Sequence, residues 1–147
     1  MSRSFLCTCA LVTIAVLGLT GSASDQDENE KAIQAVLERS YVDGVFRKRD
    51  PDLVREGFAP TFVFQRYWNG KLGSSTLDEW LEKMKLDRVP SEKNFSAKID
   101  VLDIAGDAAV VRLDLFEESR HKYRDYFGLY RTEQGWKIVS KLFHAMP

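Results

Sequence analysis

Four polar residues near the C-terminus have the types and the spacing for proton chemistry: Tyr123, Asp125, Ser140 and His144. They lie in two runs rich in aromatic and β-branched residues, 123–131 and 136–144, joined by the polar tetrapeptide 132–135. This pattern predicts a long β-hairpin. In the register we expect, Tyr123 faces His144, so that all four side chains share one face of the hairpin.

A histidine oriented by a carboxylate can move a proton or bind the polar edge of a ligand. Asp125 and His144 are therefore the candidate catalytic residues. The alternative is that both are structural groups at the rim of a sheet, because unusual ionisable residues mark functional sites only statistically. His121 lies in a charged connection, and we expect it to be solvated.

Aromatic side chains could line a pocket for a flat ligand, since their faces stack well on heterocycles. We expect Trp80 and Trp136 in the core, and Trp68, beside the turn-forming pair Asn69-Gly70, at a pocket rim. The predicted ligand-binding residues are Tyr41, Trp68, Tyr123, Asp125, Ser140 and His144.

The predicted register pairs Arg131 with Trp136 and Leu129 with Ile138. One hairpin face then carries Phe127, Leu129, Trp136, Ile138 and Leu142, and the other carries Tyr126, Tyr130, Lys137, Val139, Lys141 and Phe143. A shift of one residue would regroup both sets. The second face is too apolar to stay in water, which predicts a homodimer through Tyr126, Tyr130, Val139 and Phe143.

The N-terminal segment has the pattern of an export signal. Arg3 is the only charged residue before Asp25, residues 5–19 are apolar, and Gly21-Ser22-Ala23 provides small residues for cleavage. We expect a signal peptide over 1–23, a mature domain over 24–147, and a secreted or periplasmic protein without membrane attachment after cleavage. An uncleaved N-terminal anchor is the alternative.

The composition limits the possible functions. The chain has 21 basic and 22 acidic residues and a net charge of −1, which gives no argument for nucleic-acid binding. Both cysteines lie in the predicted signal, and two histidines remain, so we expect no zinc site. The sequence has no phosphate-binding glycine loop and no serine elbow, and we expect no cofactor.

The elements that must position these residues follow from periodicity and capping patterns. A short acidic lead-in over 25–31 precedes the fold. The predicted helices cover 30–48, 51–56 and a segment that begins at 77. The predicted strands before the hairpin cover 61–67, 95–104 and 108–117. Helices and one strand followed by four antiparallel strands predict one α+β domain whose helices cover one face of a curved sheet.

This order of elements resembles the NTF2-like superfamily, and within it the SnoaL-like, Putative lumazine-binding group. The resemblance is carried by residues 32–37, 41–44, 50–58, 76–81, 104–111, 125–126 and 135–144. It implies a cone of sheet around a pocket lined by helices. Members of the superfamily commonly form homodimers through the sheet, in agreement with the apolar hairpin face.

Enzymes of this superfamily transfer protons with carboxylates or histidines inside an apolar pocket. In ketosteroid isomerases, the base lies on the strand after the second helix, whereas here residues 61–67 contain no carboxylate. We therefore expect an exported, non-catalytic domain that binds a small aromatic or apolar ligand. The alternatives are a cofactor-free lyase, isomerase or cyclase that uses Asp125 and His144, and a purely structural homodimer.

Overall fold

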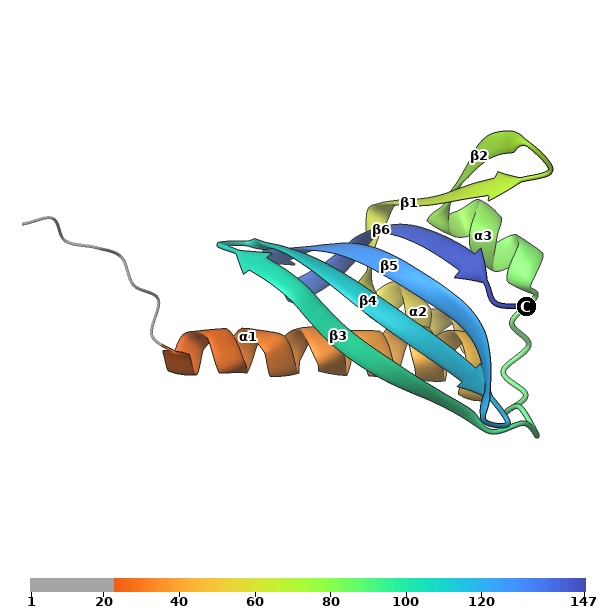
Figure 1. The fold of residues 1–147 in the computed structure, drawn as a ribbon, viewed down its shortest axis with the longest axis horizontal. Helices are drawn as coiled ribbons and strands as arrows, with labels where there is room; N and C mark the ends of the chain where they lie inside the picture. The colour runs from red at the N-terminus through yellow and green to blue at the C-terminus, as the bar shows by residue number, and fades with distance from the viewer. Residues whose placement is uncertain (1–22) are drawn as a thin grey trace, which may run out of the picture.

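The computed structural model describes residues 23–147, in which helices pack inside a curved six-stranded sheet (Figure 1). The helical elements are α1 (Ala23–Val36), the π-helix η1 (Leu37–Arg47), α2 (Pro51–Gly57) and α3 (Leu77–Met84). The strands are β1 (Phe58–Trp68), β2 (Lys71–Thr76), β3 (Phe95–Ala105), β4 (Ala108–Glu117), β5 (Arg120–Thr132) and β6 (Gly135–Ala145).

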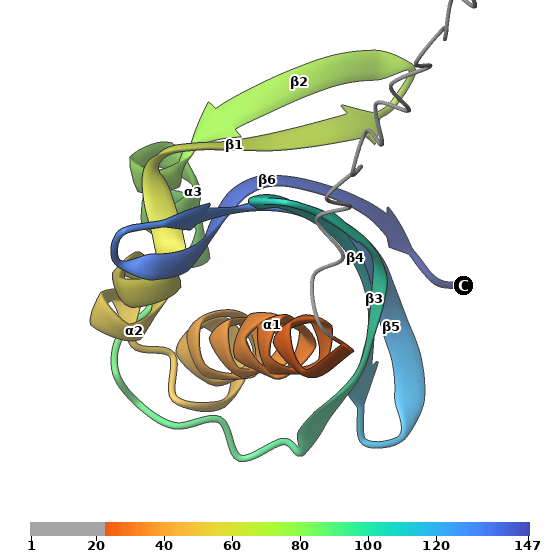
Figure 2. The same ribbon diagram turned by 90° about the vertical axis from the view of Figure 1, so that its left-hand side faces the viewer.

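The sheet order is β2-β1-β6-β5-β4-β3, and the β1–β6 pair is parallel while the other pairs are antiparallel. Figure 2 shows α1 end-on within the curl of β3 to β6. The α+β class and the packing of the N-terminal helices on a curved sheet are confirmed.

The predicted signal over 1–23 lies, apart from Ala23, outside the described residues. Within the described part, no helix is long and apolar enough to cross a membrane.

The first helix begins earlier than expected, because the acidic segment predicted as a lead-in belongs to α1. The second half of the predicted helix is the π-helix η1, at whose end the amide of Lys48 donates a hydrogen bond to the carbonyl of Asp43 at 2.7 Å. The buried side chains Ile33, Leu37, Tyr41 and Val45 recur every four residues and face the sheet. This stripe places Tyr41 in the interior, in a helix type that often occurs at functional sites.

The two short helices begin as their sequences predict. The side chain of Asp50 accepts a bond from the amide of Asp52 at 3.0 Å, ahead of α2. Thr76 and Glu79 form the reciprocal capping box of α3. The predicted core position of Trp80 is confirmed by its burial, and Leu77 and Leu81 of α3 are buried as well.

The Asn69-Gly70 turn is confirmed, with φ values of 50° and 75°, but it leads into a strand that the sequence did not predict. This strand, β2, lies at the sheet edge and is mostly exposed. Its sequence has no alternation of apolar and polar residues, which is the signal of a half-buried strand. β1 is also longer than the predicted 61–67.

The β5–β6 hairpin has the predicted register only near its turn. Arg131 pairs with Trp136 and Leu129 with Ile138, but the next pair is Gly128 with Ser140, which leaves Val139 as an extra residue. Such a bulge shifts every later pair by one. Tyr123 therefore faces Ala145 instead of His144, and Asp125 faces Phe143 instead of Leu142.

The bulge exchanges the two faces in the second half of β6. Lys141, predicted on the outer face, is buried, and Phe143 packs against the core. Leu142, predicted on the inner face, is half exposed. The predicted outer-face group of Tyr126, Tyr130, Val139 and Phe143 is therefore wrong in its last member.

Candidate functional site

A cavity of about 250 Å³ lies among η1, α3 and the nearby ends of β1, β5 and β6. Its lining is mainly aromatic and comprises Tyr41, Phe46, Phe64, Arg66, Trp80, Lys83, Met84, Tyr123, Lys141 and Phe143. Three of these described residues are basic and none is acidic. The cavity therefore combines apolar walls with a positive electrostatic character.

Lys141 reaches this cavity from β6 and is held by an ion pair in the interior. Its Nζ lies 2.7 Å from Oδ1 of Asp125 on β5, and Asp125 has no exposed surface. The other carboxylate oxygen, Oδ2, accepts a hydrogen bond from the hydroxyl of Tyr41 at 2.7 Å. Both partners of Asp125 line the cavity, so the carboxylate acts on the cavity through them.

Aromatic rings surround the amine of Lys141. Its Nζ lies 4.8 Å from the centre of the Phe64 ring and 4.9 Å from that of Phe143. The rings of Tyr41 and Phe127 are within 6 Å as well. These contacts fix the amine beside the cavity and favour a positive charge at that point.

Burial changes the ionisation of all three groups. It lowers the pKa of Lys141 and raises the pKa of Asp125, and the attraction within the pair opposes both shifts only in part. Burial, followed by the negative charge of Asp125, holds the pKa of Tyr41 well above its ordinary value. Because the pKa values of Lys141 and Asp125 move toward each other, a proton passes between them at a lower cost than in water.

Three of the six predicted ligand-binding residues belong to this site. Tyr41 and Tyr123 line the cavity, and Asp125 pairs with Lys141 directly behind it. The sequence missed Lys141, because its inward direction depends on the bulge at Val139. It also missed Phe64, Arg66 and Lys83, which come from separate elements that only the fold brings together.

The other three predicted residues lie elsewhere. His144 pairs with Arg124 across the hairpin and is exposed, so it cannot form the predicted dyad with the buried Asp125. Ser140 is exposed, and its hydroxyl lies over Gly128. A Cβ atom added to Gly128 would be only 2.6 Å from Oγ of Ser140. Trp68 is 63% exposed and does not line the cavity.

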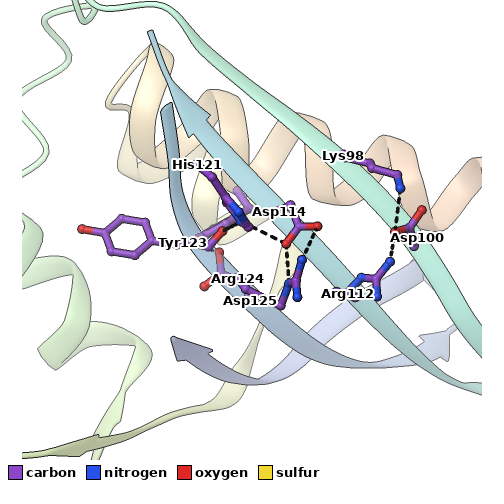
Figure 3. A network of polar contacts seen from close by, with 9 residues as sticks. Lys98, Asp100, Arg112, Asp114, His121, Tyr123, Arg124 and Asp125 are labelled. Carbon is purple, nitrogen blue, oxygen red and sulfur yellow. Dashed lines mark hydrogen bonds and ion pairs between the residues drawn. The ribbon is translucent and has the colours of Figure 1, made fainter. Parts of the chain in front are cut away.

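His121 belongs to a polar network on the outer sheet face (Figure 3). Its Nε2 lies 3.1 Å from Oδ1 of Asp114, and Arg124 donates two hydrogen bonds to the same carboxylate. The ring also stacks on Phe116, so His121 is partly buried instead of solvated as expected. Across residues 23–147, no cluster of three or more His, Cys, Asp or Glu side chains could hold a metal ion.

Comparisons with known proteins agree with this fold. A crystal structure of an NTF2-like protein of unknown function from Shewanella baltica has a TM-score of 0.67 and 27% identity, over 82% of this chain and 96% of that one. A structure described as a putative aromatic ring hydroxylase from Novosphingobium aromaticivorans has a TM-score of 0.61 at 23% identity, over 82% of this chain and 92% of that one.

Among curated proteins, Aldolase FrzH from Cladobotryum sp is 26% identical over 108 residues, which are 73% of this chain and 84% of that protein. The family model described as Putative lumazine-binding matches residues 28–144, which include the cavity and the Lys141–Asp125 pair. The chain therefore belongs to the Putative lumazine-binding family of NTF2-like proteins.

Proposed function

We propose that the protein binds a small aromatic or apolar molecule in the cavity, with an oxygen of the ligand directed at Lys141. The observation that carries the proposal is a buried amine at the wall of an aromatic cavity of about 250 Å³. Apolar walls with a few convergent polar groups are typical of small-molecule sites. The family name and the aromatic lining support the same class of ligand.

The charges of the lining indicate which polar group the ligand carries. Arg66, Lys83 and Lys141 come from β1, α3 and β6 and approach the cavity together. Cationic side chains stabilise carboxylate or carbonyl oxygens and exclude cationic ligands. We therefore expect aromatic acids and aromatic carbonyl compounds to bind in preference to aromatic amines.

Calorimetric titration of the full chain with lumazine, 4-carboxybenzaldehyde, 4-(hydroxymethyl)benzoate and benzylamine tests this proposal. Met84→Trp would fill the cavity and abolish binding, whereas Trp68→Phe, at an exposed position outside the cavity, would leave binding unchanged. Binding of the amine alone, or equal binding by Met84→Trp, would contradict the proposed site.

Catalysis is a second candidate function, favoured by the similarity to Aldolase FrzH and by the Lys141–Asp125 pair. In this alternative, Lys141 and Asp125 take the proton-transfer role that the sequence predicted for Asp125 and His144. The two candidates differ in what happens to the ligand. Recovery of an unchanged ligand supports binding alone, and a conversion that Lys141→Met abolishes supports catalysis.

Export and self-association remain part of the proposal. We propose that residues 1–23 direct export and that the domain acts outside the cytoplasm, supported by the apolar run 5–19.

We also propose pairing of two copies through the outer face of the sheet, where Tyr126, Tyr130 and Leu142 are exposed. If the protein forms this dimer but its cavity binds no ligand, a purely structural role is favoured.

A further inference from the structure

We propose that the amine of Lys141 forms an imine with an aromatic or apolar aldehyde or ketone bound in the cavity. This inference rests on the proposed ligand-binding function and names the substrate class of the same site. It requires an amine beside the ligand, a group that accepts its proton, and shielding of that amine from bulk water. Each of these is present in the described residues.

The amine has a defined position and a proton acceptor. Lys141 lines the cavity, and its Nζ lies 2.7 Å from Oδ1 of Asp125, while Tyr41 donates a hydrogen bond to the other carboxylate oxygen at 2.7 Å. The side chain of Lys141 is 5% exposed, so few water molecules compete for its amine. Buried lysines of this kind act as nucleophiles because desolvation favours the neutral amine.

The second amine of the cavity provides an internal comparison. Lys83 also lines the cavity, but its side chain is exposed and its Nζ donates a hydrogen bond to Ser75 at 3.2 Å. Lys83 therefore keeps the solvation of an ordinary surface lysine. Of the two amines, only Lys141 has a buried carboxylate at ion-pair distance among the residues that the structure describes.

The reaction balances without any further reagent. Asp125 takes one proton from the ammonium of Lys141, and the neutral amine then attacks the carbonyl carbon, giving a carbinolamine after a proton moves from nitrogen to oxygen. The proton held by Asp125 is returned to the hydroxyl group, the C–O bond breaks, and water leaves. The result is a protonated imine beside the Asp125 carboxylate.

The site suits the product as well as the starting state. Both the ammonium and the protonated imine carry one positive charge, so the ion pair with Asp125 is present before and after the reaction. The aromatic rings around Nζ stabilise a cation in either form. Because the net charge of the site does not change, imine formation leaves no unpaired buried charge.

Borohydride trapping of the full chain tests the inference. The protein is incubated near pH 7 with 4-carboxybenzaldehyde, reduced with sodium cyanoborohydride, digested, and mapped by mass spectrometry. We expect one reduced adduct at Lys141, formed before any adduct at the exposed lysines, because the cavity holds the aldehyde beside this buried amine.

Two controls make the result specific. The alcohol 4-(hydroxymethyl)benzoate has the same ring and carboxylate but cannot form an imine, and an excess of it should suppress labelling at Lys141. Lys141→Arg should lose the adduct, whereas Lys137→Arg should keep it, because Lys137 is on the same strand but bonds the carbonyl of Glu56 outside the cavity. Mapping and competition on the wild-type chain decide the question even if Lys141→Arg fails to fold.

The possible outcomes separate this inference from the proposed function. A competed adduct at Lys141 supports both. If the aldehyde and the alcohol bind but no adduct forms at Lys141, or if labelling is confined to Lys83 and other exposed lysines, the imine is overturned and ligand binding stands. If neither compound binds and no adduct forms, both proposals fail for this class of ligand.

Discussion

Lys141 and Asp125 are diagonal neighbours on the inner face of the β5–β6 hairpin, with 2.7 Å between Nζ and Oδ1. The pair lies in the interior, where removing two charges from water costs more than most ion pairs return. An arrangement of this kind is weak support for stability alone. Its position at the wall of an aromatic cavity makes it the centre of the functional proposals.

The first prediction is that Asp125 and Lys141 contribute to the free energy of unfolding as a strongly coupled pair. Asp125→Asn leaves the Lys141 ammonium unpaired, and Lys141→Met leaves the Asp125 carboxylate unpaired, so each should lower the free energy of unfolding by about 3–5 kcal/mol. The double variant removes both charges and keeps an acceptor for Tyr41, and it should recover most of the loss. Urea unfolding of the four proteins measures the coupling, and additive losses would contradict it.

The second prediction concerns acid stability at the outer sheet face. Hydrogen bonds from Arg124 hold the pKa of Asp114 below its ordinary value of 3.8. A lowered pKa contributes stability that is fully present above the unfolded-state value and is lost as the pH falls through the folded-state value. The positive charge of Arg112 also favours the ionised form of this carboxylate.

Asp114→Asn should therefore lower the free energy of unfolding by about 1.5–3 kcal/mol at pH 7 and by less below pH 3.8. Chemical unfolding of both proteins at pH 7 and at several pH values below 3.8 measures the difference. A gap that stays constant with pH would show that the charge of Asp114 does not cause the loss. Asp103→Asn, at an exposed site, is the matched control.

The third prediction concerns the contact that positions the helix of Tyr41. A Cβ atom on Gly57 would lie 2.5 Å from Cβ of Ser40, so α2 packs directly on η1. Gly57→Ala should lower the free energy of unfolding by about 1–3 kcal/mol through overpacking. In Gly73→Ala the nearest atom is 3.7 Å away, and this control should be almost neutral in the same thermal unfolding assay. Equal losses would show that the close contact is not responsible.

The fourth prediction concerns the oligomeric state. If two copies pair through the outer sheet face, Tyr130→Glu and Leu142→Glu bury a carboxylate in the interface and should dissociate the dimer. Sedimentation velocity at several concentrations measures this, with Gln134→Glu in the hairpin turn as the control. A wild-type chain that sediments as a monomer at every concentration would exclude the proposed dimer. Phe143→Glu should instead damage the core, because Phe143 packs against it.

The fifth prediction concerns processing. Expression with an intact N-terminus should yield an exported protein that begins after residue 23 or 24, because residues 5–19 form an apolar run before small residues. N-terminal sequencing of the secreted or periplasmic fraction identifies the first residue. Intact Met1 in a membrane fraction would indicate an anchor.

Most of the helices and strands could be predicted from local sequence patterns. The apolar stripe of the first helix, the cap at Asp50, the capping box at Thr76 and the Asn69-Gly70 turn are local patterns, and each appears in the structure. Together with the meander of strands, they were sufficient to predict the α+β fold. Local signals succeed here because caps and turns depend on residues only a few positions apart.

The candidate site, in contrast, depends on contacts that form only in the folded chain. The single extra residue at Val139 turns Lys141 inward, and no local pattern in β6 marks that bulge. The period of a strand is two, so a shift of one residue moves a charged side chain from solvent into the core. Tyr41, Asp125 and Lys141 then meet because η1 packs inside the curved sheet. Tyr41 and Asp125 are 84 residues apart in the sequence, so no local pattern could reveal their contact.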